Sequence, residues 1–246
     1  NGVGYDTVDI AAAARRGIPV CNVPDYGTEE VADHAIALAM AQVRQLFPLN
    51  REAMSLGWKL HVKGKLRRLS TLTFGIVGLG RIGTACALRA KALGFRVMFH
   101  DPYLPPGVHK AVGVERADSL PELLKQADVL SLHTPLTDGT KYLIAEKELA
   151  LMKPTAYIVN ISRGPIIDEK ALIDVLERRA IAGAALDTFD IEPLPKDHPL
   201  FKTPNTLICP HLGYVIDDSY AAFYSGIIEN VRAFTSGEPV RTINED

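Results

Sequence analysis

The sequence predicts a doubly wound α/β fold, in which a parallel β-sheet carries helices on both faces. Two observations predict it. From residue 72 onward, short apolar runs alternate with helical patterns, an order typical of parallel sheets. The first apolar run leads directly into the glycine-rich turn Gly78-Leu79-Gly80-Arg81-Ile82-Gly83. The chain of 246 residues is long enough to bury one large core or two small ones.

The part before residue 72 predicts two short elements and one long helix. We expect a helix over 8–15 that is capped near Thr7, and a strand over 18–23. Two elements cannot bury a core by themselves, so residues 1–26 are expected to be the C-terminal remnant and hinge of a second domain. After a linker, Thr28 is expected to cap a largely buried helix that runs to about Leu46. The polar stretch 51–69 is interpreted as a solvated connection, because its basic residues lack the interleaved aromatics of a nucleic-acid site.

The alternating elements define the main domain, which we expect to span 27–212. The predicted strands are 72–77, 96–100, 128–132, 155–160, 182–186 and 206–209, and the predicted helices between them are 82–93, 119–126, 146–151 and 168–178. The last part, 213–246, is predicted to hold an amphipathic helix over 217–235 and an extended segment at 240–243 that returns towards the second domain.

The glycine-rich turn is typical of a Rossmann dinucleotide-binding site, the alternative being a glycine-rich turn without a ligand. Gly78 permits the tight turn, Gly80 allows a pyrophosphate to approach the backbone, and Gly83 lets the helix pack closely on the strand. The helix N-terminus favours phosphate. Asp101, at the end of the next strand, can accept hydrogen bonds from the ribose hydroxyls and would repel a 2′-phosphate. The motif therefore predicts NAD rather than NADP.

Polar residues follow four other predicted strands, and in such sheets ligands bind beyond the carboxyl ends of the strands. These residues are His133, Thr134, Pro135, Asn160, Ser162, Arg163, Gly164, Asp187, Glu192, Pro210, His211 and Gly213. Hydride transfer to a carbonyl needs a proton donor, a cation for a carboxylate and a group that tunes the donor. His211 suits the first role, Arg163 the second and Glu192 the third.

Two further positions carry polar chemistry. Asp187 is expected to accept a hydrogen bond from the nicotinamide carboxamide and so to fix the face of the ring. Asp33 and His34 lie on the long helix, where we interpret the histidine as packed or interfacial beside a surface acid rather than catalytic.

Five ordered motifs resemble the D-isomer-specific 2-hydroxyacid dehydrogenases. They are Gly75 to Gly83, His133-Thr134-Pro135-Leu136-Thr137, Val159-Asn160-Ile161-Ser162-Arg163-Gly164, Ala185-Leu186-Asp187-x-Phe189 with Glu192-Pro193-Leu194, and Pro210-His211-x-Gly213. The resemblance implies that Arg163 is the substrate cation, Glu192 the histidine partner and His211 the general acid/base. It implies NAD contacts at Gly78, Gly80, Arg81, Ile82, Gly83, Asp101, His133, Thr134, Pro135, Thr140, Ile161, Ser162, Arg163, Asp187, His211 and Gly213. Residues 1–24 are similar to the end of the family's flavodoxin-like substrate domain.

The resemblance leaves an alternative in function. Asp101-Pro102-Tyr103-Leu104 and Cys21-Asn22-Val23-Pro24 are similar to the C-terminal-binding-protein branch, which implies an NAD-sensing transcriptional corepressor or scaffold with little turnover. His211-Leu212-Gly213-Tyr214 is more similar to the enzymes, for which a small D-2-hydroxy or 2-oxo acid is the expected substrate. Since the family's N-terminal substrate segment is absent, we expect cofactor binding with slow turnover.

Composition limits the remaining classes. A net charge of −2 gives no reason to expect a nucleic acid, and neither a membrane-spanning run nor a signal peptide is present in this sequence. Cys21, Cys86 and Cys209 form no C-x-x-C, so we expect buried thiols in the cytoplasm and assign no metal-binding residue. The buried helix and the family resemblance predict a homodimer through the NAD-binding domain.

Overall fold

A seven-stranded parallel sheet organises the chain in the computed structural model, which describes residues 2–55, 58 and 66–244. The strand order is β3-β2-β1-β4-β5-β6-β7, and every neighbouring pair is parallel. The strands are β1 Thr73–Val77, β2 Arg96–His100, β3 Glu115–Arg116, β4 Val129–Leu132, β5 Tyr157–Asn160, β6 Gly183–Leu186 and β7 Thr206–Ile208. The order reverses between β1 and β4, and ligands bind at such a switch point in doubly wound sheets. The predicted fold class is confirmed.

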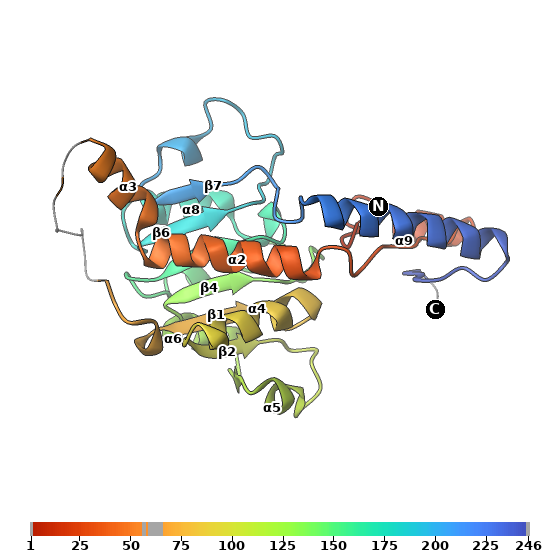
Figure 1. Ribbon diagram of the computed structural model, residues 1–246, viewed down its shortest axis with the longest axis horizontal. Coiled ribbons are helices and arrows are strands. Elements are labelled where there is room, and N and C mark those ends of the chain that lie inside the picture. Colours follow the sequence, from red (N-terminus) through yellow and green to blue (C-terminus); the bar gives the residue numbers. More distant parts are fainter. Residues whose placement is uncertain (1, 56–57, 59–65, 245–246) are drawn as a thin grey trace.

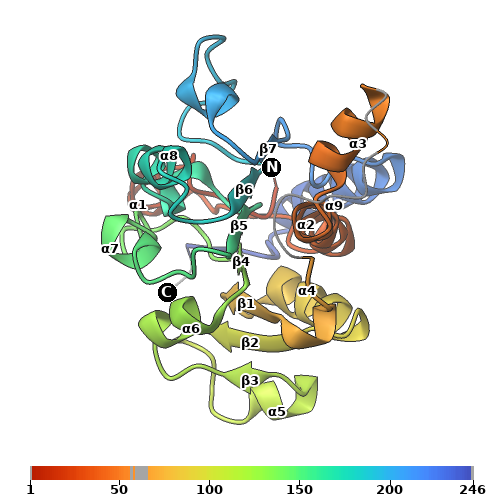
Figure 2. The same cartoon turned by 90° about the vertical axis from the view of Figure 1, so that its left-hand side faces the viewer.

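Helices cover both faces of the sheet (Figures 1 and 2). The helices of the described residues are α1 Ile10–Arg15, α2 Thr28–Val43, α3 Leu46–Met54, α4 Arg81–Ala92, α5 Val108–Val112, α6 Leu120–Gln126, α7 Glu146–Leu149, α8 Glu169–Glu177 and α9 Asp217–Thr235, of which α9 extends away from the sheet. Helices α2 and α4 pack on one face around Phe74 and Phe99, and α6, α7 and α8 pack on the other around Leu130 and Ile158. All five residues of β1 are buried, which is why its sequence is a continuous apolar run rather than an alternating one.

The structure differs from the sequence predictions around the long helix. Helix α2 begins at Thr28, with Gly27 at the N-cap in place of the predicted Thr28. It ends at Val43 instead of Leu46, because Gln45 adopts a left-handed conformation with φ of 53° and a new helix, α3, follows. The predicted connection 51–69 therefore begins inside a helix, and its segments 56–57 and 59–65 lie outside the described residues.

The sequence also missed two small elements at the edge of the sheet. Helix α5 and strand β3 follow the loop after β2, where the sequence predicted neither a helix nor a strand. Elements of five and two residues are too short to give a periodic signal.

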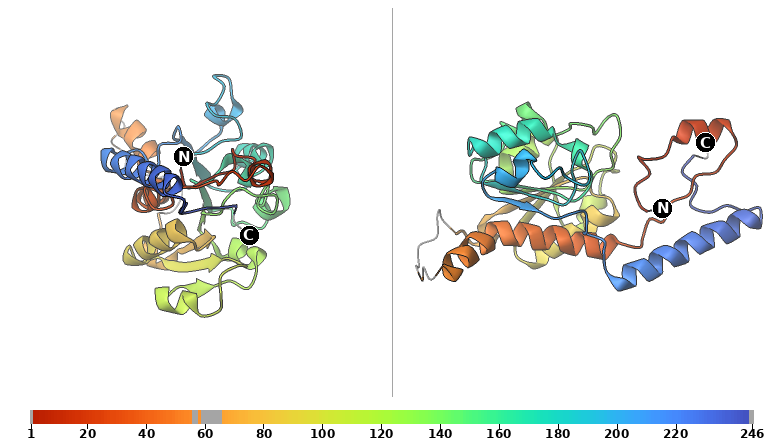
Figure 3. Two further views of the ribbon diagram at one scale, coloured as in Figure 1. Left: turned by 90° about the vertical axis from the view of Figure 1, so that its right-hand side faces the viewer. Right: turned by 90° about the horizontal axis from the view of Figure 1, so that it is seen from above.

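Residues 18–23 and 240–243, which come from opposite parts of the chain, lie side by side and away from the sheet (Figure 3). The predicted strand over 18–23 is wrong: this segment makes only an isolated antiparallel bridge between Cys21 and Thr242. Residues 240–243 lie against this segment, because the N–H of Ile243 also donates to the carbonyl of Val20 at 2.8 Å, and their return towards a second domain stays a prediction. Helix α1 is capped by Asp9 rather than near Thr7.

Candidate active site

The turn between β1 and α4 has the geometry that its glycines predict. Gly78 adopts φ of +89°, a conformation that disfavours side chains. A Cβ added to Gly83 would lie 2.1 Å from the carbonyl oxygen of Gly78, so only glycine allows α4 to approach the strand this closely. The carboxylate of Asp101 accepts a hydrogen bond from the N–H of Leu79 at 3.0 Å and another from that of Tyr103 at 3.0 Å. Asp101 thus also fixes the turn, which the sequence did not indicate.

The surroundings of this turn fit a dinucleotide. A Cβ added at Gly80 would meet no heavy atom within 4 Å, so the backbone there faces open space beside the N-terminus of α4. The buried hydroxyl of Thr134 has no hydrogen-bond partner among the described residues, which leaves it available to a ligand. Arg81, the first residue of α4, is exposed and pairs with Asp25 at 3.1 Å. These groups are the ones expected to hold NAD.

Other predicted cofactor contacts build the loops themselves. The Ser162 hydroxyl donates to the carbonyl of Leu132 at 2.7 Å, and the Thr140 hydroxyl donates to the carbonyl of Pro135 at 2.6 Å. The side chain of Ile161 is buried, whereas Ile82 lies half-buried in the first turn of α4. These residues shape the edge of the sheet, and direct contact with NAD remains a prediction for each of them.

His133 lies beneath the glycine-rich turn in its neutral form. Burial lowers its pKa to about 3. Its Nε2 is 2.8 Å from the Ser131 hydroxyl, and its Nδ1 has no partner among the residues that the structure describes. A Cβ added at Gly83 would lie 3.4 Å from the Cβ of His133, so this ring supports the turn from below.

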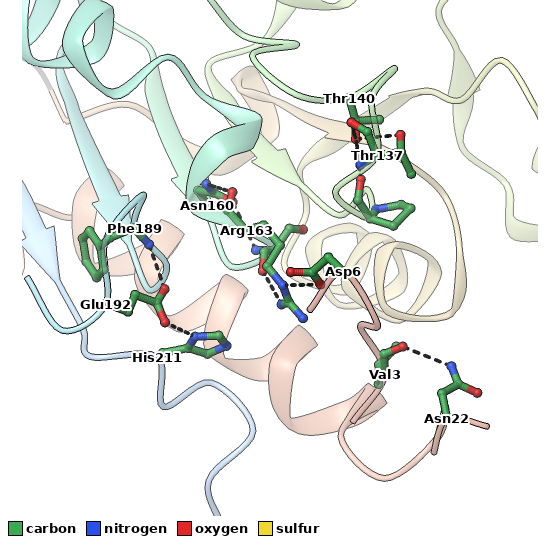
Figure 4. Close-up of polar contacts among 12 residues, drawn as sticks. Val3, Asp6, Asn22, Thr137, Thr140, Asn160, Arg163, Phe189, Glu192 and His211 are labelled. Atoms are coloured by element: carbon green, nitrogen blue, oxygen red, sulfur yellow. Dashed lines mark hydrogen bonds and ion pairs between the residues drawn. The ribbon is translucent and has the colours of Figure 1, made fainter. Parts of the chain in front are cut away.

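Arg163 follows β5 and is held by two hydrogen bonds (Figure 4). Its Nε donates to Asp6 at 3.0 Å, and one terminal nitrogen donates to the carbonyl of Ser162 at 2.8 Å. Gly4 lies so close to the other terminal nitrogen that an added Cβ would be 1.9 Å from it. The buried Asn160 amide closes the turn by donating to the carbonyl of Arg163 at 2.8 Å. Three of the five N–H groups of the guanidinium are thus left, and they can bind a carboxylate.

Glu192 and His211 form the predicted pair. Nδ1 of His211 lies 2.7 Å from one carboxylate oxygen of Glu192, and the other oxygen accepts the N–H of Phe189 at 2.9 Å (Figure 4). This contact leaves Nε2 of His211 to face a substrate. His211 has φ of 56°, in a region where histidine is enriched among non-glycine residues. A Cβ on Gly164 would lie 1.9 Å from the carbonyl carbon of Phe189, so the loop of Arg163 packs directly on the loop of Glu192.

Asp187 anchors the segment that follows His211. It is 2% exposed, and its two carboxylate oxygens accept the N–H groups of Leu212 and Gly213, each at 2.9 Å. His34 of α2 reaches Asp187, with its Nε2 3.5 Å from Oδ1. Hydrogen bonding to Asp187 is the largest cause, and to Cys209 the next, of a pKa for His34 raised to about 9.

These contacts change three sequence interpretations. His34 faces the buried Asp187, whereas the surface acid Asp33 pairs with Arg89 at 2.5 Å. Cys86 is buried as expected, but Cys209 is only half-buried and lies beside His34 instead of in apolar surroundings. Asp187 had been assigned to the nicotinamide alone. The backbone contacts of Asp187 depend on loop conformation, which residue spacing does not reveal.

Sequence reasoning also missed Asp6 and Gly4 as neighbours of Arg163. Their signal was the motif Gly4-Tyr5-Asp6, which had been assigned only to the end of the second domain. No local pattern links it to a loop 157 residues further along the chain.

Together, these features define a class of protein. Arg163, Glu192 and His211 follow β5, β6 and β7, which are neighbours in the sheet, and the glycine-rich turn follows β1 at the same edge. A cation, a carboxylate and an imidazole thus share an edge with a dinucleotide site, as a nicotinamide-dependent oxidoreductase requires.

Comparison with known proteins identifies the family. Residues 36–213 match the model of the D-isomer specific 2-hydroxyacid dehydrogenase NAD binding domain. The chain is 41% identical over 248 residues to a glyoxylate reductase of Korarchaeum cryptofilum, covering 99% of this chain and 74% of the relative. It is 40% identical over 237 residues to a D-3-phosphoglycerate dehydrogenase of Methanocaldococcus jannaschii, a match that covers 96% of this chain and 45% of the relative. The chain belongs to the D-isomer-specific 2-hydroxyacid dehydrogenase family.

Solved structures agree with this assignment. The D-lactate dehydrogenase of Aquifex aeolicus, crystallised with NAD and lactic acid, superimposes on this structure with a TM-score of 0.92 at 30% sequence identity. The match covers 100% of this chain and 79% of the A. aeolicus chain. A glyoxylate reductase from Paecilomyes thermophila gives a TM-score of 0.88 at 35% identity, covering 99% and 73%. The predicted family, the enzyme class and NAD as cofactor are confirmed, and the comparisons give no support to the corepressor alternative.

Proposed function

We propose that the chain interconverts a small 2-oxo acid and the D-2-hydroxy acid with NADH and NAD, with glyoxylate as the first substrate to test. The observation that carries the proposal is the 2.7 Å contact between His211 and Glu192, in a loop that packs on the loop of Arg163. Several relatives are named glyoxylate reductase, which supports the choice of substrate.

Each of the three side chains has a defined task in this reaction. Arg163 binds the substrate carboxylate through the N–H groups that Asp6 and Ser162 leave free, which orients the neighbouring carbonyl. His211 donates a proton from Nε2 to the carbonyl oxygen as that oxygen gains charge. Glu192 orients the imidazole through Nδ1 and stabilises its protonated form. NADH supplies the hydride when bound at the glycine-rich turn.

The test is NADH oxidation by the purified chain with glyoxylate, hydroxypyruvate and pyruvate. We expect turnover of at least one of the three, and none with any 2-oxo acid would refute the proposal. His211→Ala should abolish turnover and leave NADH binding nearly intact, because the imidazole acts on substrate and not on the glycine-rich turn. Loss of both activities together would instead show that His211 is structural.

We further propose that the chain works as a homodimer through its NAD-binding domain, in the cytoplasm. Apolar side chains on and after α3 are exposed, among them Phe47 at 56%, Met54 at 77% and Trp58 at 90%. Exposed apolar side chains of this kind can be buried against a second copy of the chain. Among the described residues, no helix combines the length and the apolar character of a membrane span. Sedimentation that shows only monomer would contradict the homodimer.

A further inference from the structure

Three potential metal ligands meet beside the segment that follows His211. His34 comes from α2, Asp187 from the end of β6 and Cys209 from the end of β7. One ligand atom of each residue lies within 4.8 Å of the other two. Over residues 2–55, 58 and 66–244, no other set of three histidine, cysteine or acidic side chains is grouped this tightly.

The spacing of these atoms suits one tetrahedral ion. Zinc binds nitrogen and oxygen ligands at about 2.0–2.2 Å and sulfur at about 2.3 Å. At a tetrahedral angle, two such ligand atoms are separated by about 3.3–3.8 Å. His34 Nε2 and Asp187 Oδ1 are 3.5 Å apart, which is longer than a good hydrogen bond and matches two ligands of a shared ion.

Each of the three groups has a lone pair to offer. Nε2 of His34 is buried and makes no hydrogen bond of good geometry within the described residues. Each oxygen of Asp187 accepts one backbone N–H and keeps a second lone pair. Cys209 contributes a thiol that forms no disulfide. Nitrogen, sulfur and oxygen donors together select zinc or its cobalt substitute rather than magnesium or calcium.

The three residues lie at different depths below the surface. The side chain of His34 is 24% exposed and Cys209 is half-buried, whereas Asp187 forms the floor at 2%.

We propose that His34, Asp187 and Cys209 form a binding site for Zn²⁺ or a similar borderline-soft divalent cation, separate from the substrate site. The three residues supply three ligands, and water completes the tetrahedron. The ligands bind the ion in their deprotonated forms, so any proton they carry is released on binding.

A bound ion acts on catalysis through Asp187. The carboxylate that coordinates the metal is the one that holds the N–H groups of Leu212 and Gly213, directly after His211. Coordination redirects the charge of this carboxylate, so we expect a bound ion to weaken its hold on the segment that carries His211. The site is therefore inhibitory.

Cobalt gives the decisive test, because it reports the ligands without requiring activity. Adding Co²⁺ to the purified, reduced chain should produce a near-ultraviolet thiolate-to-cobalt band and the visible bands of tetrahedral Co²⁺, saturating at one equivalent. Cys209→Ala and His34→Leu should each lose the tetrahedral spectrum. Cys21→Ser, which removes another half-buried thiol, should retain it.

Other outcomes would overturn the proposal. An absent band in the wild type, or a band that persists in Cys209→Ala or vanishes in Cys21→Ser, places the metal elsewhere or nowhere. Cys209→Ser, checked by circular dichroism, provides a variant of nearly unchanged size if the alanine variant unfolds. The factor by which Zn²⁺ lowers the rate of NADH oxidation, relative to the metal-free rate of the same protein, should be at least tenfold larger for the wild type than for Cys209→Ala. Equal inhibition of the two proteins would refute the link to the His211 loop.

Discussion

Asp6 is predicted to control substrate affinity through Arg163, and replacing Asp6 by alanine tests this role. The Nε of Arg163 donates to Asp6 at 3.0 Å, and the two side chains are 30% and 20% exposed. A hydrogen bond between charged groups contributes about 1.5–3 kcal/mol. Since this pair is partly solvated, we take the lower end, about 1.5 kcal/mol, which corresponds to about tenfold in affinity.

The expected result is a KM for glyoxylate raised about tenfold, with kcat changed by less than about threefold, because proton transfer by His211 is untouched. The assay is NADH oxidation at saturating NADH over a range of glyoxylate concentrations. Asp6→Asn keeps an oxygen for Nε and should have a smaller effect. Asp9→Ala, which removes the cap of α1 in the same segment, should leave KM unchanged. A lower KM in Asp6→Ala would show that Asp6 competes with substrate for Arg163, and this would refute the reasoning.

Three other perturbations test the cofactor side. Gly80→Ala should fold with a loss of at most about 1 kcal/mol in the free energy of unfolding, because the added Cβ meets open space. It should nevertheless bind NADH at least about tenfold more weakly. Unchanged NADH binding in a fluorescence titration would show that the pyrophosphate does not bind at this turn. The wild type should bind NADH more tightly than NADPH. Asp101→Asn, which keeps an oxygen for the N–H of Leu79, should lower the ratio of the NADPH and NADH dissociation constants about tenfold. An unchanged ratio would show that Asp101 only fixes the turn. The pKa of His133 is about 3 in the folded chain and about 6.5 when unfolded, so its contribution to stability is complete above pH 6.5 and is lost as the pH falls. Between pH 7 and 5 this loss of unfolding free energy is about 2 kcal/mol. Urea unfolding should therefore show that His133→Gln loses about 2 kcal/mol less than the wild type over this pH range. Equal losses in the two proteins would contradict the burial of a neutral ring.

The sheet could be predicted from the sequence because its strands are continuous apolar runs that end in glycine, proline or polar residues. Buried parallel strands leave this pattern whatever surrounds them. The break at Gln45 could not be predicted, because a single left-handed residue between two helices has no periodic signal. The segment 18–23 has the composition of a strand but forms only one β-bridge, between Cys21 and Thr242, and a strand needs a partner along its length.

The positions of the site residues at strand ends could be predicted because they follow from the predicted strands. Once the sheet is parallel, Arg163, Glu192 and His211 must share one edge, and their chemistry follows from residue type. The groups that hold them could not be predicted. Asp6 and His34 reach the site from segments far away in the sequence, and their roles depend on a hydrogen bond at 3.0 Å and a contact at 3.5 Å.

The site is stiff because each functional group is fixed by the next. Arg163 is continuous with Gly164, whose missing side chain lets Phe189 pack against it, and the N–H of Phe189 holds Glu192. Glu192 in turn holds His211, and Asp187 holds the two residues that follow. A displacement at any point is therefore passed to the imidazole, since close-packed neighbours cannot absorb it. Gly164 and Asp187 both position the imidazole, so replacing either should lower kcat for NADH oxidation even though neither is expected to touch the substrate carbonyl.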